Sequence, residues 1–529
     1  MKFNLLDEPW ILVRHGTTVK EVSLKNLFRH AHEYHSLAGE LPTQDAAILR
    51  VLLAVLYGTF TKADTDGKFA EIKDYDEAIR RWKSLWERAC FPIELIEQYL
   101  DEYCDRFWLF HPESPFFQVA GIRTAKNDFE PVTKIMAHVP SRPERMFFTE
   151  LSGKAVESLS FAQAARWLIH LQAWDYAGKK NSIMGGVMDG GGTGWCGKLG
   201  VVYPVGANLF ETLMLNLVFA DRSSQMIRLG APIWEEEPRT VEKRDLIPKS
   251  YVELLTWQSR RTRLFYEDDR VNGVISSYGD VFDKKNTFIE QMSGWHESSQ
   301  KGKGHIPNLH LSSRSMWRDL GALLPQSDEG SKTRRPGVLD WLSELEINGI
   351  INLCAVGYEY GAMQGIVNEL ISDSITLNTK LLAELGKDWA VNIIGLIDST
   401  EKAVNALGSL EFDLYQAAGG DRAKFKGRSR EQAYFSLDEP FRAWLEKIIP
   451  DSSPVLDTSN QWKISAKRII AKIGEDLIAE AGDAALVGRE LDKGKGKGKV
   501  EKYYMSAAIA SMRFWKALID VFGKEAPNE

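Results

Sequence analysis

The sequence is poor in cysteine and has no long apolar run. Its four cysteines (Cys90, Cys104, Cys196 and Cys354) are widely separated, and none forms a Cys-x-x-Cys pair. That spacing excludes a zinc ribbon and argues against a disulfide framework. No stretch approaches the roughly 18 consecutive apolar residues of a membrane-spanning helix. The first residues also lack the apolar core and cleavage site of a signal peptide. The sequence therefore predicts a cytoplasmic protein that does not insert into a membrane.

Common catalytic motifs are also missing. The His-Glu-x-x-His zinc motif and the Gly-x-Ser-x-Gly nucleophile motif do not occur. His30, His32 and His35 lie close in sequence, but His30 and His32 would not share one face of a helix. No acidic partner for a catalytic triad is evident beside them. We therefore predict a protein that is not an enzyme and that needs no metal and no cofactor.

Excess basic charge is the third absence. The formal net charge is −7, which does not suit a general nucleic-acid coat. Basic residues nevertheless cluster in four places, at 258–263, 332–335, 422–430 and 493–499. A single such cluster is usually a solvated loop. Four of them on an acidic chain can guide an anionic polymer to one surface.

The chain is long enough for two or three domains, and its pattern changes near residue 370. Before that point short strands and helices alternate, with an expected hairpin over 10–22 and expected strands at 251–266 and 274–278. After it, helical patterns cover about 376–386, 388–408, 430–448, 461–484 and 503–522. The sequence predicts an α+β protein, with a mixed α/β domain over 1–370 and an antiparallel four-helix bundle over 371–529.

The segment 178–200 is the most informative stretch, because nine of its 23 residues are glycine. Gly192-x-Gly194-x-x-Gly197 has the dinucleotide-binding spacing, and Gly197-Lys198 nearly completes a phosphate-binding loop. Both motifs need a strand before the loop and a helix after it. Here a helix that starts near Ser158 or Ser160 and stops at Gly178 is expected before the segment, and a strand over 201–205 after it. A nucleotide-dependent enzyme that uses the loop 185–200 is the alternative interpretation.

Glycine also lets a backbone approach a ligand closely. The minor groove of a DNA duplex is about 6 Å wide and admits little more than backbone or a thin side chain. A glycine-dense loop flanked by Lys179, Lys180 and Lys198 could enter such a groove and contact phosphates. The plain alternative is a mobile surface loop.

Several short motifs then occur in an order that resembles the CasA family, the large subunit of the type I-E CRISPR Cascade effector complex. The motifs are Asn4-Leu5-Leu6-x-x-x-Trp10-Ile11-x-Val13-Arg14, Phe107-x-Leu109-x-His111-x-x-x-Pro115-Phe116-x-Gln118, the glycine segment, Trp257-Gln258, Gly357-Tyr358 and the helical last third. The resemblance spans nearly the whole chain. It implies a non-catalytic subunit of an RNA-guided antiviral complex, in which base pairing reads the target and protein reads a short flanking motif.

The resemblance also implies a mechanism and partners. The subunit would recognise the protospacer-adjacent motif in double-stranded DNA from the minor groove and promote strand opening. It would then hold the displaced strand and help to recruit a helicase-nuclease. Its further partners would be the subunits that carry the CRISPR RNA, namely the backbone and the small-subunit dimer. A scaffold that binds only protein is a third interpretation.

Three DNA-probing elements are carried over from the family. A glycine loop matches Gly190, Gly191 and Gly192. A lysine finger matches Lys285 best, with Lys284 one position away. A glutamine wedge matches Gln364. The physical chemistry suits each type, since lysine can donate to groove acceptors and a flat amide can stack into an opened base step.

Two further sets of residues complete the prediction. A family loop that docks on the complex corresponds to 142–154, with Phe147 and Phe148 as candidates for insertion or, equally, for buried core. Basic residues near the probing elements are candidate phosphate contacts: Lys179, Lys180, Lys198, Arg260 and Arg261. The chain departs from the family pattern by two extra residues before Gln364 and by different residues over 193–196.

Overall fold

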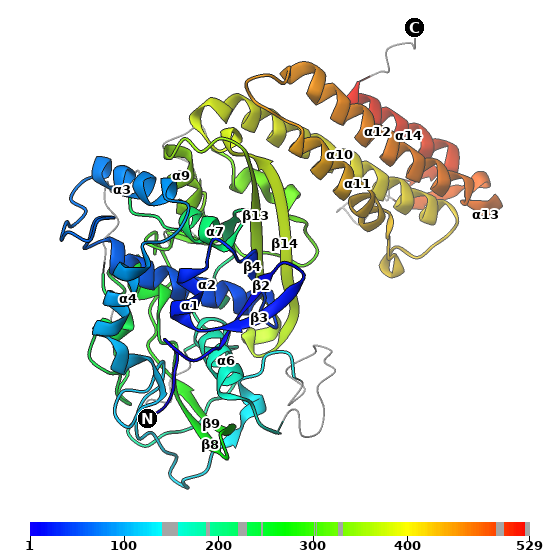
Figure 1. Ribbon diagram of the computed structural model, residues 1–529. Coiled ribbons are helices and arrows are strands. Elements are labelled where there is room, and N and C mark those ends of the chain that lie inside the picture. Colours follow the sequence, from blue (N-terminus) through cyan, green and yellow to red (C-terminus); the bar gives the residue numbers. More distant parts are fainter. Residues whose placement is uncertain are drawn as a thin grey trace. The chain divides into compact units, whose positions relative to one another are not determined.

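The computed structural model describes residues 1–139, 157–186, 191–220, 230–244, 247–300, 302, 304–325, 332–492 and 502–523. The chain forms two compact units (Figure 1). The first comprises Met1–Met316, Asp328–Ile347 and Ile351–Ile375, and the second comprises Trp317–Ser327, Asn348–Ile350 and Thr376–Glu529. Helices and small antiparallel sheets occur together, which confirms the predicted α+β class.

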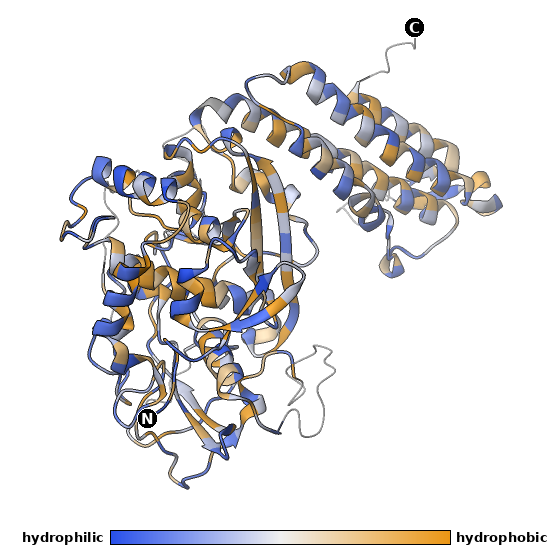
Figure 2. Ribbon diagram, in the orientation of Figure 1, coloured by the Kyte–Doolittle hydropathy of each residue, from blue (hydrophilic) through white to orange (hydrophobic). Residues whose placement is uncertain are grey.

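Helix α2 (Pro42–Phe60) forms the centre of the first unit. It packs against α4 (Ile93–Glu102), α6 (Phe161–Trp174) and α8 (Tyr251–Leu255). Most residues of α2 are apolar, as its colour in Figure 2 shows, and nearly all are buried, so α2 is a core helix covered by protein. By length and composition α2 could cross a membrane, but 94% of its 18-residue apolar stretch is buried within the protein.

Helix α6 leads into the glycine segment. Ser160 caps its start and Gln163 completes a capping box, which confirms one of the two predicted starts. The helix ends at Trp174 rather than at Gly178, so the predicted end is wrong. Asp175 leaves the helical conformation, with φ −54° and ψ 140°, and its carboxylate binds two cations described below.

Two antiparallel sheets carry the segments that matter for function. Strand β7 (Val201–Val205) pairs with β13 (Ile350–Tyr360), which lies beside β14 (Val367–Asn378). Strand β8 (Arg260–Glu267) pairs with β9 (Arg270–Tyr278), and β9 also pairs with β6 (Glu130–Pro131). The strands expected at 201–205 and 274–278 are confirmed. The strand expected over 251–266 is wrong in its first part, because Ser250 caps the short helix α8 there.

The remaining elements of the first unit are short. The predicted hairpin over 10–22 is confirmed as β2 (Ile11–His15) and β3 (Thr18–Val22). Among the described residues, the other α-helices and strands of this unit are β1 (Lys2–Asn4), α1 (Leu24–Arg29), β4 (Ser36–Leu37), α3 (Tyr75–Glu87), β5 (Trp108–Phe110), α7 (Leu209–Leu215), β10 (Trp295–Glu297), β11 (His305–Pro307), β12 (Thr333–Arg334) and α9 (Gly337–Glu344).

Long helices make up most of the second unit: α10 (Lys387–Ala417), α11 (Ser429–Glu446), α12 (Val455–Ala479) and α14 (Ala507–Phe522). Each packs on others of the set around an apolar core, where the rings of Phe441 and Trp462 lie 4.9 Å apart. The short helix α13 (Gly482–Val487) and the hairpin β15 (Arg489–Asp492) and β16 (Lys502–Met505) precede α14. The helix expected over 376–386 does not form, because β14 continues to Asn378 and single 3₁₀ turns follow it.

Candidate nucleic-acid interface

Three separate segments of the first unit meet at Gly191 and Gly192. They are the glycine segment, the turn between β13 and β14, and the loop that follows β9. A methyl group built on Gly192 would lie 3.7 Å from Cε of Lys198 and 4.0 Å from Oε1 of Gln364. The backbone N–H of Ala177 donates to the carbonyl of Gln364 over 2.8 Å. The structure therefore brings the predicted glycine loop and the predicted glutamine wedge together.

The turn between β13 and β14 has an unusual backbone. Met363 and Gln364 have φ values of 53° and 55°, in the left-handed region that non-glycine residues seldom adopt. Hydrogen bonds from Gln364 N to Gly361 O (3.0 Å) and from Gly361 N to Ile366 O (2.9 Å) close the turn. Such conformations cost about 1–3 kcal/mol each and concentrate at functional sites. Met363 is also 94% exposed, an apolar side chain at the tip that the sequence analysis missed.

The lysines of the site have different surroundings. Burial, together with the charges of Arg260 and Lys284, lowers the pKa of Lys198 to about 8, although Asp283 opposes this shift. Lys284 is half-buried, and burial lowers its pKa as well, against the attraction of Asp283. Lys285 is exposed and forms an ion pair with Asp283, with its Nζ 3.0 Å from Oδ2. The sequence favoured Lys285, but Lys284 is the lysine whose charge acts on Lys198 beside Gly192.

Two of the predicted phosphate contacts are buried around Asp175 (side chain 3% exposed). Nζ of Lys180 lies 2.7 Å from Oδ2 of Asp175, and Nε of Arg260 lies 2.5 Å from the same oxygen. Burial alone would raise the pKa of Asp175, but the charges of Lys180 and Arg260 hold it at about 2. Burial lowers the pKa of Lys180 to about 7, although Asp175 opposes that shift. These two cations are engaged within the protein, which corrects the expectation that they contact phosphates.

Arg260 instead supports the glycine segment. Its Nη2 donates to the carbonyl oxygens of Gly192 (2.8 Å) and Tyr176 (3.1 Å), and its Nη1 donates to the carbonyl of Ser259 (2.9 Å). At Gly194 any Cβ would come within 2.4 Å of the Ala173 carbonyl oxygen, so glycine is needed for this close approach to the end of α6. The segment is therefore held at several points next to α6.

Arg261 requires the same correction. Its side chain is 1% exposed, and its Nη2 lies 2.6 Å from Oδ1 of the equally buried Asp280. The guanidinium also donates to the main-chain carbonyls of Thr240 and Glu242. Arg261 therefore fastens the segment around 240–242 to the β8–β9 hairpin, and a phosphate group has no access to it.

A second buried carboxylate links the glycine segment to the lysine loop. The Glu290 side chain is fully buried, and its Oε2 accepts a hydrogen bond from Nε1 of Trp195 over 2.7 Å. Arg50 of α2 binds both carboxylate oxygens, each over 2.9 Å. Glu290 lies six residues after Lys284, so this carboxylate fixes the end of the lysine loop against the glycine segment. No sequence signal distinguishes it among 73 acidic residues.

The other predicted residues are less informative. Gly191 is buried, and a methyl group there would lie 2.9 Å from Cγ2 of Val281. Lys179 is exposed. Gly190, Phe147 and Phe148 lie outside the described residues. The predicted glycine loop is therefore described only from Gly191 onward.

The nucleotide alternative finds little support in the geometry. A single 3₁₀ turn, Cys196–Lys198, ends the glycine segment, and strand β7 follows it. No helix N-terminus thus faces the position that phosphates would occupy in a phosphate-binding loop. Among the described residues, no group of three or more His, Cys, Asp or Glu side chains is arranged to hold a metal ion.

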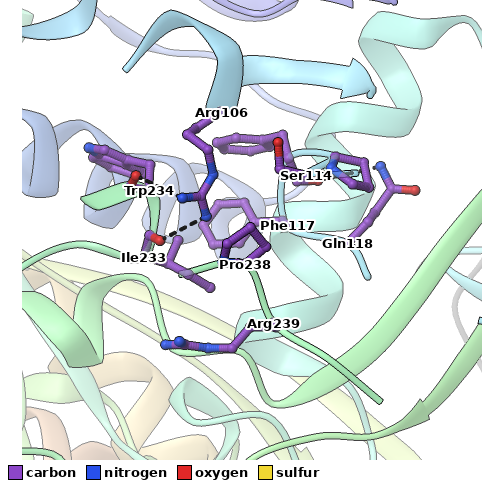
Figure 3. A pocket seen from close by; sticks show the side chains of 10 residues that line it. Arg106, Ser114, Phe117, Gln118, Ile233, Trp234, Pro238 and Arg239 are labelled. Carbon is purple, nitrogen blue, oxygen red and sulfur yellow. Dashed lines mark hydrogen bonds between the residues drawn. The ribbon is translucent and has the colours of Figure 1, made fainter. Parts of the chain in front are cut away.

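Two cavities among the described residues of the first unit are of water size. The one in Figure 3 lies between Phe117, Trp234, Arg106 and Arg239 and has a volume of about 20 Å³, enough for one water molecule. Arg106 in its wall is already bound to the carbonyls of Ile233, Trp234 and Glu236. A second cavity of the same volume lies beside Trp195 and Trp257. Neither is large enough for a nucleotide.

Comparison with known proteins identifies the class of this fold and site. The chain matches the family model described as CRISPR-associated protein Cse1 over residues 4–473. The Cse1 of Thermobifida fusca is 34% identical, with a TM-score of 0.83 over 98% of each chain. A CasA/Cse1 protein of Thermus thermophilus is 29% identical over 449 residues, 81% of each chain. A chain of a CRISPR RNA-guided surveillance complex, 18% identical, shares the fold over 90% of this chain and 99% of its own, with a TM-score of 0.66.

The protein is therefore a CRISPR-associated protein. Within that class it belongs to the Cse1 family, because the family model covers most of the chain. The resemblance to the CasA family noted in the sequence is confirmed.

Proposed function

We propose that this chain is the DNA-reading subunit of an RNA-guided surveillance complex. It recognises the protospacer-adjacent motif in double-stranded DNA from the minor-groove side and promotes strand opening. Membership of the Cse1 family supports this proposal, as does the fold shared with a chain of a CRISPR RNA-guided surveillance complex. In such a complex the guide reads the sequence, and protein has to read only the flank.

The observation that carries the proposal is that Lys198 and Gln364 both lie beside Gly192, with the charge of Lys284 acting on Lys198. A glycine backbone is thin enough for a minor groove. The groove floor offers only acceptors at A·T pairs, N3 and O2, and a lysine ammonium is a suitable donor to them. We assign the groove contact to Lys284 and a phosphate contact to Lys198, with Lys179 as a further exposed cation.

The turn between β13 and β14 supplies the opening step in this proposal. Its strained backbone presents the Gln364 amide beside the glycine segment and exposes Met363 at the tip. Amide and apolar side chains can both enter a partly unstacked base step and kink the duplex. Opening at the first base pair would let the guide begin to pair.

The remaining roles follow from the family. The helices α10, α11, α12 and α14 would form an antiparallel four-helix bundle, within the domain at 371–529, that holds the displaced strand. Phe147 and Phe148 would dock on the subunits that carry the CRISPR RNA, namely the backbone and the small-subunit dimer. A helicase-nuclease would be recruited to the assembled complex and make the cut. The chain itself would need no cofactor and make no bond.

The test is binding of the reconstituted guide complex to short duplexes that differ only in the flanking trinucleotide. The proposal expects affinities that depend on the flank and fall steeply with salt, because phosphate contacts release counterions. Thermal stabilisation of the chain by ATP or NAD, with no effect of the flank, would favour the nucleotide enzyme. Equal binding to every flank, or no salt-sensitive DNA binding at all, would favour a protein-only scaffold.

A further inference from the structure

Two tyrosines of β13 hold the base of the turn between β13 and β14. Tyr358 and Tyr360 are two residues apart, so their side chains lie on the same face of the strand. The Tyr358 hydroxyl lies 2.9 Å from Oγ1 of Thr43 and 3.0 Å from Nε2 of His170. The Tyr360 hydroxyl donates to the carbonyl oxygen of Trp174, the last residue of α6, over 2.8 Å. Tyr358 therefore anchors β13 in the core, and Tyr360 anchors the end of the strand from which the turn begins.

The stretch 174–177, which leads out of α6, is bound to this turn at both of its ends. The carbonyl of Trp174 accepts the hydrogen bond from Tyr360. Three residues later, the backbone N–H of Ala177 donates to the carbonyl of Gln364 over 2.8 Å. One of these two bonds is made by a side chain, that of Tyr360, and can be removed by substitution.

The middle of the same stretch holds the glycine segment. The carbonyl of Asp175 accepts the backbone N–H of Gly194 over 2.8 Å. The carbonyl of Tyr176 accepts from Nη2 of Arg260, which also donates to the carbonyl of Gly192. One short piece of backbone therefore fastens both the turn and the glycine segment.

The surroundings of Tyr360 keep its hydroxyl in the donating form. Burial raises the pKa of Tyr360 well above its usual value, and Tyr358 and Asp175 raise it further. A methyl group built on Gly197 would collide with the hydroxyl oxygen, so the glycine segment packs directly against this group. Tyr360 thus touches the glycine segment and the end of α6, while it belongs to the strand that leads into the turn.

The turn and the glycine segment differ in what they would lose with this hydroxyl. The glycine segment stays fastened by Arg260, and by Trp195 through its hydrogen bond to Glu290. The turn would keep its backbone bond from Ala177 but lose its side-chain bond to the end of α6. Loss of the hydroxyl therefore loosens the turn more than the glycine segment.

We propose that Tyr360 is a positioning residue for strand opening, whose hydrogen bond to Trp174 holds the turn so that the Gln364 amide stays beside Gly192. Tyr360 acts through Gln364 and makes no contact with DNA itself. Reading of the flank uses the glycine segment and its lysines and does not depend on this hydroxyl. The inference rests on the proposed function, because it concerns the opening step that was assigned to Gln364.

The first test measures opening in the reconstituted guide complex with a fluorescent base analogue at the first target pair. Tyr360→Phe keeps the ring and removes only the hydroxyl. We expect opening to be roughly fivefold slower, which is the factor that the loss of one neutral hydrogen bond supplies. The spread of closed-duplex affinities between flanks should stay that of the wild type.

Tyr57→Phe is the matched control. It removes another buried hydroxyl, which donates to the carbonyl of Val218 over 2.8 Å and takes no part in these contacts. This variant should open at the wild-type rate. Equal slowing by the two variants would overturn the proposal, because the effect would then come from general destabilisation.

A double-variant cycle separates positioning from an independent contribution. If Tyr360 acts through Gln364, Tyr360→Phe slows the wild-type complex but adds nothing to the slowing caused by Gln364→Ala. Effects that multiply in the double variant would overturn the proposal. A smaller spread of affinities between flanks in Tyr360→Phe would also overturn it, since the hydroxyl would then support the reading of the flank.

A second measurement uses the free chain. The Gln364 carbonyl protects the backbone N–H of Ala177, and hydrogen–deuterium exchange reports the opening of that bond. Exchange at Ala177 should be faster in Tyr360→Phe than in the wild type and unchanged in Tyr57→Phe. Unchanged exchange in Tyr360→Phe would show that the hydroxyl does not hold the turn.

The two proposals fail in different ways. If Gln364→Ala slows opening and Tyr360→Phe does not, only the present inference is wrong. If the wild-type complex shows no flank dependence, the reading step of the proposed function fails. If Gln364→Ala opens at the wild-type rate, the wedge assignment fails and the role of Tyr360 in opening falls with it, while exchange at Ala177 still decides whether Tyr360 holds the turn.

Discussion

Arg260 on β8 donates from Nη2 to the carbonyl oxygen of Gly192 over 2.8 Å, and its Nε binds Asp175 over 2.5 Å. This guanidinium joins the end of α6 to the glycine segment from a strand 68 residues further along the chain. The glycine segment is therefore not shaped by its own sequence alone. One buried arginine is among the contacts that fix its position.

Replacement of this arginine should destabilise the first unit. Arg260→Met leaves the Asp175 carboxylate with Lys180 as its only cation and removes the donors to three carbonyl groups. Breaking a buried ion pair costs about 3–5 kcal/mol in free energy of unfolding. Denaturant unfolding of the variant measures this loss. Arg270→Ala, an exposed change on the same hairpin, should stay within about 0.5 kcal/mol of the wild type. Equal effects of the two changes would contradict the anchoring role.

Duplex affinity should fall as the pH rises from 7 to 9. The pKa of Lys198 is about 8, so its ammonium group is charged at pH 7 and mostly neutral at pH 9. A phosphate bound to Lys198 favours the charged form, and binding above pH 8 must therefore take up a proton, at up to about tenfold in affinity per pH unit. Duplex titrations at several pH values and constant ionic strength measure how steeply the affinity falls with pH. Lys198→Arg stays charged and should flatten it, whereas an unchanged slope in that variant would exclude Lys198 as the cause.

Lys180 should make stability depend on pH in the opposite sense from an ordinary ion-paired lysine. Its folded pKa of about 7 lies below the usual 10.5, so between these values the unfolded chain binds more protons than the folded one. The contribution of Lys180 to the free energy of unfolding therefore increases from pH 7 toward pH 10. Lys180→Met should remove on the order of 1 kcal/mol of this increase between pH 7 and pH 9. Parallel pH profiles for variant and wild type would contradict the prediction.

Gln364→Ala should slow strand opening while closed-duplex affinity stays close to that of the wild type. Unstacking a base step costs a few kcal/mol. If the amide offsets about 1 kcal/mol of that cost, its loss slows opening roughly fivefold. A fluorescent base analogue at the first target pair reports opening in the reconstituted complex. Met363→Ala is the comparison, because Met363 occupies the tip of the same turn. If only the Met363 variant is slow, the apolar side chain rather than the amide is the wedge.

Features of the site with local causes could be predicted from the sequence. The hairpin over 10–22 follows from alternating residues around a turn, and the start of α6 follows from Ser160 with Gln163 three residues later. The helix–loop–strand order around 178–205 could be recognised as well, and it distinguishes the glycine segment from a phosphate-binding loop. The family was also recognisable, since its motifs keep their order.

Long-range pairings could not be predicted. Arg260 and Lys180 look like surface cations in sequence, and only the fold shows that Asp175 lies between them. Glu290 is one acid among many until Trp195 and Arg50 are placed around it. Lys284 and Lys285 are adjacent in sequence, so the sequence does not distinguish them as candidates for the lysine finger. In the fold their surroundings differ, because Lys284 acts on Lys198 and Lys285 pairs with Asp283.

The measurement that tests the central claim most directly is flank-dependent duplex binding by the reconstituted complex with Lys284→Ala and Lys285→Ala side by side. The two changes remove the same charge one position apart, but the charge of Lys284 acts on Lys198 beside Gly192, whereas Lys285 forms an ion pair with Asp283. A hydrogen bond from a charged donor is worth about 1.5–3 kcal/mol, so Lys284→Ala should reduce the spread of affinities between flanks about tenfold or more, and Lys285→Ala should preserve it. A wild-type complex that binds every flank equally, or a Lys284→Ala complex that keeps the full spread, would contradict the account.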